Sequence, residues 1–271
     1  MTVLTKQIPG QVARRLLAVQ ARQLQHHEDL FVEALREMFR QQSRAVIGLL
    51  DKTNKAISTK LSHDDDGIDE ELSGIQKLFR GIFTAIGVSS VATGFRAAID
   101  QFSLSESIRV LNPKPVNPAE DAALARLIDR RLKLLNDQTS KTTSRAIKRI
   151  VEDADSVGVA KEGIKGFMTG PNAEYRALRI ARTESVALHN RAAEHAFAKA
   201  GIQKKRWLTN QDKKTCQFCP KLNGKIVGVG ENYFNKGDQF VGERGGVLRL
   251  NYDNTPTPPI HPNCRCTIIP A

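Results

Sequence analysis

Two short stretches decide how the chain is held together: KKTCQFCPK, residues 213–221, and PPIHPNCRCTIIPA, residues 258–271. Together they contain all four cysteines of the 271-residue chain. Cys216 and Cys219 form a C-x-x-C knuckle, in which two thiolates can converge on one metal ion while turn amides stabilise their charge. The spacing therefore predicts one half of a metal site.

The second stretch supplies three further donors, which are His261, Cys264 and Cys266. Five candidates thus compete for the four tetrahedral places of one zinc ion per chain. Cys216, Cys219 and Cys264 are the firmest predicted ligands, and His261 and Cys266 compete for the last place. Four protein ligands leave no position for an activated water, so the predicted site is structural and not catalytic.

Two other interpretations of the cysteines stay open, namely two disulfides between the clusters and four free thiols. Residues 1–20 show no secretory signal, because arginines interrupt their apolar run. Synthesis in the cytosol is therefore expected, and there paired cysteines are read as metal ligands before disulfides.

The chain is predicted to be mainly α-helical. Leu24, Phe31 and Met38 recur every seven residues, which predicts an amphipathic helix or a helix pair from Gln11 to about Leu50, within an extended helical N-terminal region. The apolar stretch at residues 81–95 is too short, and too rich in Gly, Ser and Thr, to span a membrane.

Three prolines within residues 112–121 mark the best domain boundary. Asn117 in this stretch is the predicted N-cap of the next helix. We divide the chain into an unrecognised helical region (1–111), a helical middle (112–201) and a small cysteine-rich module (202–271).

A long helix is predicted from about Asn172 to Ala200, with Gly201 ending it. Residues 202–271 then change in composition, with many glycines and prolines and short β-type runs at 205–208, 224–229 and 246–250. They predict a small α+β module with too little apolar material for a core of its own, which zinc would staple.

The formal net charge of +12 predicts a polyanionic partner. That partner can be nucleic acid, an acidic protein surface or an anionic membrane. The basic residues are spread along both halves of the chain and are not set in one recognition helix, which suggests sequence-independent contact.

Three blocks of the sequence together resemble one family. They are RIARTESVALHNRAAEHAFAKAG, KRWLTNQDKKTCQFCPKLNGKIV and PPIHPNCRCTIIP. In this order they are similar to the phage head morphogenesis family of Mu protein F-like minor head proteins, over roughly residues 120–271. The matching positions are Ile180, Ala181, Arg182, Thr183, Glu184, Asn190, Trp207, Asp212, Cys216, Cys219, Leu222, Gly224, Pro258, Pro259, His261, Pro262, Cys264, Arg265 and Cys266.

The resemblance implies a structural minor capsid protein of a tailed bacteriophage, made in the host cytoplasm and located inside the virion head near the portal. Its implied partners are the portal protein, the major capsid protein and packaged DNA, in head assembly or genome delivery, and multiple copies per head are compatible with it. Some relatives carry toxin or enzyme domains after the CRC motif, and because this chain stops at Ala271 we expect none here.

Structural or interaction roles are expected for six further residues. The resemblance singles out Asn190, Trp207 and Asp212, and Arg179, Arg182 and Glu184 lie in its helical block. Arg182 and Glu184 are two positions apart and do not face each other, so we expect them to fasten the long helix to the zinc module.

No enzyme is expected. The sequence has no HExxH, no paired carboxylates beside the cysteines and no H-x-E with P-C-x-x-C. His189 and His195 are six positions apart and make a poor metal pair. The alternative function is a zinc-dependent nucleic-acid-binding protein or a nuclease-like enzyme.

Overall fold

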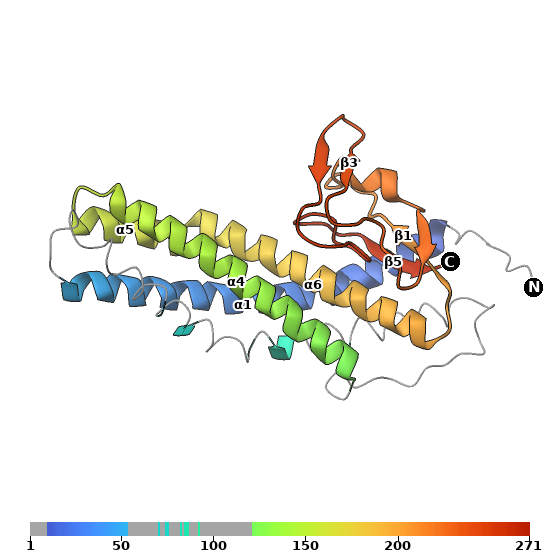
Figure 1. Cartoon of the computed structure of the whole chain (residues 1–271), viewed down its shortest axis with the longest axis horizontal. Helices are drawn as coiled ribbons and strands as arrows, with labels where there is room; N and C mark the ends of the chain where they lie inside the picture. Colours follow the sequence, from blue (N-terminus) through green and yellow to red (C-terminus); the bar gives the residue numbers. More distant parts are fainter. Residues whose placement is uncertain are drawn as a thin grey trace, which may run out of the picture. The chain divides into compact units, whose positions relative to one another are not determined.

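The fold was obtained as a computed structural model that describes residues 10–53 and 121–271, with a few scattered positions between residues 70 and 92. The helices are α1 (Gly10–Thr53), α4 (Ala122–Glu152), α5 (Val157–Thr169) and α6 (Pro171–Lys199). Within the described residues all strands lie after α6 (Figure 1), so the prediction of a mainly helical chain with a small sheet-containing C-terminal region is confirmed. The boundary at 112–121 and the apolar stretch at 81–95 lie almost wholly outside this description.

The chain forms two compact units that alternate along the sequence. One comprises residues 1–28, 87–126 and 180–271, and the other comprises residues 29–86 and 127–179. The division into three consecutive parts remains a prediction.

The unit built from residues 29–86 and 127–179 is helical wherever it forms regular structure in the described residues. The heptad pattern of α1 continues into its core, where Phe31 and Met38 are buried. The Arg176 guanidinium lies over two aromatic rings, 4.7 Å from the ring centre of Phe39 and 4.1 Å from that of Phe167. Cation–π contact with both rings compensates for the partial burial of this charge.

Gly158 and Gly163 lie inside α5, although glycine lowers helix propensity. Ser156 caps this helix by accepting a hydrogen bond from the Val159 amide. A side chain at position 163 would lie 2.7 Å from Ile150 of α4, so the glycine allows the two helices to pack closely.

The start of α4 also differs from the prediction. The helix begins at Ala122, and the Asp121 carboxylate accepts from the amides of Ala123 and Leu124. The expected cap Asn117 lies outside the described residues.

The long helix before the module is confirmed as α6, and it ends as the sequence predicts. Gly201 has a φ of +72°, and Ile202 N donates to Phe197 O while Gly201 N donates to Ala198 O. These two bonds form a Schellman motif, which turns the chain away from the helix axis.

The module after α6 contains two small antiparallel sheets. One has the order β2-β1-β5, and the other pairs β3 with β4. The strands are β1 (Lys204–Leu208), β2 (Ile226–Gly228), β3 (Gln239–Val241), β4 (Val247–Arg249) and β5 (Thr267–Pro270). Residues 202–271 are all described and contain one further helical element, the 3-10 helix η2 (Cys219–Leu222), so the expected small sheet-containing module is confirmed, and its helical part is this single short turn. Its glycines and prolines favour turns over helix.

Candidate metal centre

The two cysteine clusters meet in the C-terminal module. Cys216 Sγ lies 2.9 Å from His261 Nε2, and Cys219 Sγ lies 3.3 Å from the same nitrogen. Cys219 Sγ also lies 3.8 Å from Cys264 Sγ. Donor atoms from segments more than 40 residues apart therefore share one site, and they could hold a metal ion.

Local backbone geometry presents these donors. The amide of Cys219, at the start of η2, donates to Cys216 Sγ over 3.3 Å, as expected in a C-x-x-C knuckle. In the second cluster Asn263 has a φ of +64°, and the Cys264 amide donates to His261 O. Asparagine is among the few residues that adopt this left-handed conformation readily, so the turn brings His261 and Cys264 to the same side.

The donors form two overlapping groups of three. One contains Cys216, Cys219 and His261, and the other contains Cys219, Cys264 and Cys266, so Cys219 is common to both. Tetrahedral zinc with Zn–S bonds of about 2.3 Å places two sulfurs about 3.8 Å apart. The separation of Cys219 and Cys264 matches that value.

Cys266 belongs to the second group of donors, with Cys219 and Cys264, and also contacts Thr209. Its sulfur lies 3.8 Å from Thr209 Oγ1, and the thiol is buried. The neighbouring thiols Cys219 and Cys264, and then Trp207 and Thr209, lower the pKa of Cys266.

The thiols of the cluster differ in proton affinity: hydrogen bonds with neighbouring thiols, together with burial, raise the pKa values of Cys219 and Cys264, whereas those of Cys216 and Cys266 are lowered. The hydrogen bond from Cys219, followed by that from His261, lowers the pKa of the Cys216 thiol to about 4. Burial lowers the pKa of His261, but the hydrogen bonds with Cys216 and Pro262 outweigh it and leave the pKa raised. His261 Nδ1 lies 2.7 Å from the carbonyl oxygen of Pro262, which can only accept. Nδ1 therefore carries a proton, and Nε2, which faces the sulfurs, is the nitrogen that could bind a metal ion.

An ion pair fastens the two clusters to each other. Arg265 donates to both carboxylate oxygens of Asp212, with both distances 2.6 Å. Asp212 also accepts from the Lys214 amide over 2.8 Å, and so orders the loop that leads to the knuckle. The Arg265 guanidinium is the main cause that lowers the pKa of Asp212 to about 2.

Asn190 of α6 fastens β5 from the opposite side. Its fully buried amide donates to Val186 O and Cys266 O, over 2.9 and 3.2 Å. Its Oδ1 accepts from Thr267 Oγ1 and Ile268 N, over 2.9 and 3.0 Å. All four hydrogen-bonding positions of this side chain are thus used, three of them by residues 266–268.

Trp207 on β1 is fully buried and makes an edge-to-face contact with Tyr233, at 5.0 Å between ring centres. It packs in the core of the module, opposite Ile268 in the strand register. The structural role implied for Trp207 by the resemblance agrees with this position.

The remaining predicted residues lie on α6 at different places. The salt bridge of Arg182 is to Glu28 of α1, over 3.1 Å, and not to the C-terminal module as expected. Glu184 is buried. Arg179 belongs to the other unit, where its guanidinium lies 5.8 Å from the ring centre of Tyr175. Arg182 pairs with α1 because the two helices run past each other in one unit, which spacing along α6 alone does not reveal.

Three residues that were not chosen as site candidates also support the cluster. Thr183 Oγ1 accepts from the Asn263 amide over 3.2 Å, Thr209 Oγ1 donates to Cys219 O over 2.8 Å, and Arg265 forms the pair with Asp212. Thr183 and Arg265 stood in the quoted family pattern without an assigned role. Alternation along β1 was the available signal for Thr209, because Lys205, Trp207 and Thr209 are all buried.

These features define a class of protein in which long helices are followed by a small β module that contains a Cys/His cluster. The model of the family Phage Mu protein F like protein matches residues 128–269, more than half of the chain, so the chain belongs to this family. The match contains all five candidate metal donors. Searches of curated proteins and of solved structures found no match.

Proposed function

We propose that the chain is a structural minor capsid protein that acts in head morphogenesis of a tailed bacteriophage. Membership of the Phage Mu protein F like family supports this function. The main structural support for the proposal is that residues of the family's motif have structural roles in this chain. Asn190, Asp212 and Arg265 all hold the C-terminal module together or hold it to α6.

The proposed cofactor is one structural zinc ion, bound by Cys216, Cys219, His261 and Cys264. The separation of the Cys219 and Cys264 sulfurs and the position of His261 Nε2 beside Cys216 and Cys219 support this set. Cys266 then acts as a buried neighbour that packs against Thr209. Such a closed set supports a structural role and an absence of enzymatic activity.

Elemental analysis of protein purified under reducing conditions tests the zinc assignment. We expect about one zinc per chain in the wild type, none in Cys219→Ser, and retention of zinc in Cys266→Ser. Loss of zinc from Cys266→Ser with retention in His261→Ala would show that Cys266, and not His261, is the fourth ligand. A wild-type protein without zinc under metal-replete conditions would refute the cofactor.

The proposed partners are the portal protein, the major capsid protein and packaged DNA, contacted without sequence preference. The net charge of +12 supports the DNA contact. None of the described helices is long and apolar enough to cross a membrane. The proposed location is the inside of the virion head near the portal.

Co-purification with proheads, assembled with and without portal protein, tests the capsid role. We expect portal-dependent incorporation, together with DNA binding that weakens steeply with salt and does not depend on sequence. Failure to enter proheads, combined with sequence-specific DNA binding by the isolated protein, would favour the alternative of a zinc-dependent nucleic-acid-binding protein.

A further inference from the structure

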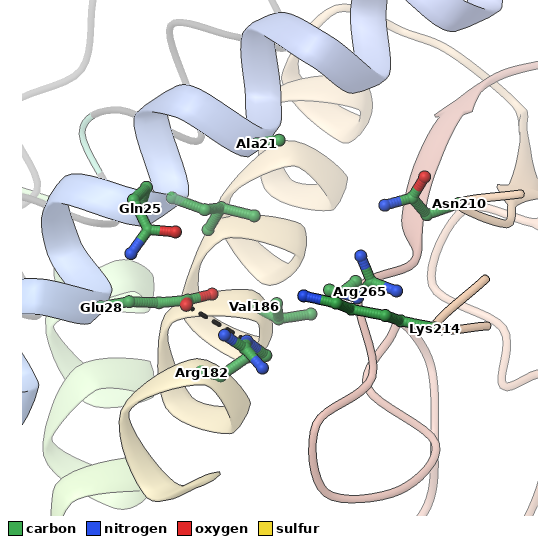
Figure 2. Close-up of a pocket in the computed structure, with 9 residues that line it drawn as sticks. Ala21, Gln25, Glu28, Arg182, Val186, Asn210, Lys214 and Arg265 are labelled. Atoms are coloured by element: carbon green, nitrogen blue, oxygen red, sulfur yellow. Dashed lines mark hydrogen bonds and ion pairs between the residues drawn. The ribbon is translucent and has the colours of Figure 1, made fainter. Parts of the chain in front are cut away.

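A polar cavity of about 190 Å³ lies beside the metal cluster in the unit that contains residues 180–271. Figure 2 shows its lining, which comes from α1, α6 and the loops of the C-terminal module. The polar side chains of the lining are Gln25, Glu28, Arg182, Asn210, Lys214 and Arg265. Three cationic side chains thus face a single carboxylate, and two side-chain amides complete the polar wall.

Both arginines of the cavity are held in place by carboxylates. Arg182 uses its Nε to donate to Glu28, and among the described residues no acceptor is found for its two terminal amino groups. Arg265 is fixed by its paired hydrogen bonds with Asp212. A guanidinium whose direction is set beforehand loses less side-chain entropy when it binds an anion.

Lys214 supplies the charge that the cavity does not neutralise. Its side chain is exposed and has no acidic partner within the part of the chain that the structure describes. In Figure 2 its ammonium end points from the C-terminal module toward α6 and Arg182. The backbone of Lys214 is fixed independently, because its amide donates to Asp212.

We propose that this cavity is a phosphate-binding site, with Lys214 and Arg182 as its charged donors and Asn210 and Gln25 as its neutral wall. A tetrahedral phosphate presents oxygens in several directions, which suits donors that arrive from two helices and a loop, whereas a carboxylate presents two oxygens in one plane. At about 30 Å³ per liquid water, the cavity has room for roughly six waters, so a phosphate fits with part of its hydration shell.

The phosphate can belong to a free anion, to the end of a nucleic-acid strand or to its backbone, since the same chemistry recognises all three. The proposal does not depend on the capsid role or on incorporation into proheads. It depends only on the geometry of α1, α6 and the loops around the metal cluster.

Isothermal titration of the zinc-loaded full chain at constant ionic strength tests the site with three probes. They are inorganic phosphate, a short 5′-phosphorylated oligonucleotide and the same oligonucleotide without the terminal phosphate. Lys214→Ala is the test variant, and Lys213→Ala is the matched control, because it removes the same charge at the preceding position, which does not line the cavity. Arg182→Lys keeps the charge but removes the fork of donors.

We expect Lys214→Ala to weaken binding of whichever probe binds by roughly tenfold to a hundredfold, as for loss of a charge-assisted hydrogen bond. Lys213→Ala should change it less than about threefold, and Arg182→Lys should weaken it measurably. Preference for inorganic phosphate or the 5′-phosphorylated strand would identify a free or terminal phosphate, and equal binding of both oligonucleotides would identify the backbone. Absence of binding by all three probes, or equal losses in Lys213→Ala and Lys214→Ala, would overturn the proposal.

Discussion

Replacement of Asn190 by alanine should detach β5 from α6. The substitution removes the acceptor of Thr267 Oγ1 and Ile268 N and the donor to Cys266 O. Alanine has a higher helix propensity than asparagine, so α6 itself should not be weakened. Any loss of stability therefore comes from the contact between the helix and β5.

The magnitude follows from the three groups that lose their partner. A buried polar group left without a partner costs roughly 1–3 kcal/mol. Thr267 keeps a 3.3 Å contact with Ile268 O, so its share lies at the lower end. We expect a total loss of about 3–5 kcal/mol in the free energy of unfolding, a large part of the 5–15 kcal/mol typical of a folded domain.

Urea denaturation followed by tryptophan fluorescence measures this loss, because Trp207 is the only tryptophan and lies fully buried on β1 beside β5. Asn172→Ala is the matched control, since it makes the same substitution at an exposed position of α6 and should change the free energy by less than about 0.5 kcal/mol. Asn190→Asp should also destabilise the module, because it keeps the shape but points an acceptor at the carbonyls of Val186 and Cys266.

A loss below about 1 kcal/mol in Asn190→Ala, with an unchanged Trp207 transition, would refute the reasoning. The four hydrogen bonds of Asn190 would then not be what holds β5 to the helix.

Three further substitutions test other contacts. Asp212→Asn removes the ion pair with Arg265. Because the carboxylate is 40% exposed, we expect a loss of at most about 1 kcal/mol in the free energy of unfolding at pH 7, measured by urea denaturation. A loss above about 3 kcal/mol would contradict this expectation. Hydrogen bonds from Lys199 and His195 hold the pKa of Asp121 well below its usual range, so the contribution of this carboxylate to stability is present above about pH 4 and declines at lower pH. Asp121→Asn should cost about 1–2 kcal/mol in the free energy of unfolding at pH 7, and the difference from wild type should shrink in melts at lower pH. A difference that stays constant with pH would argue against the ion pair. Burial, with a smaller effect of His27, lowers the pKa of His189 to about 4, so only the unfolded chain takes up a proton at this histidine as the pH falls below about 6.5. Between pH 7 and 5 the wild type should therefore lose about 2 kcal/mol in the free energy of unfolding that His189→Leu does not lose. Parallel pH profiles of the two proteins would exclude His189 as the cause.

The parts of the fold that were predictable from the sequence depend on local patterns. The seven-residue repeat of Leu24, Phe31 and Met38 predicts α1, because buried positions on one helix face recur at this spacing. Gly201 predicts the end of α6, because helices commonly end at a glycine in the left-handed conformation, which Gly201 adopts. The proximity of the two cysteine clusters was predictable for a chemical reason, because four cysteines and one histidine are enough to supply the four ligands of a tetrahedral zinc ion.

The contacts that surround the Cys/His cluster were not predictable in the same way. Asp212 and Arg265 are 53 positions apart, and Glu28 and Arg182 are 154 apart. Charge patterns identify pairs three or four positions apart on a helix but carry no information on which distant charges meet. The strand β5 was missed because it is a four-residue run next to the cysteines, and such short apolar runs are ambiguous without knowledge of their partner.

The segment from Asn263 to Thr267 shows why the choice between His261 and Cys266 matters beyond coordination. Successive residues of this segment are fastened to different parts of the unit: Asn263 to Thr183, Cys264 to Cys219, Arg265 to Asp212, and Cys266 and Thr267 to Asn190. The Cys266 backbone is thus committed to α6, and moving its sulfur toward Cys216 would strain that contact. His261 precedes the fastened segment and already lies beside Cys216 and Cys219, so it can complete the tetrahedron while the hydrogen bonds of Asn190 stay in place.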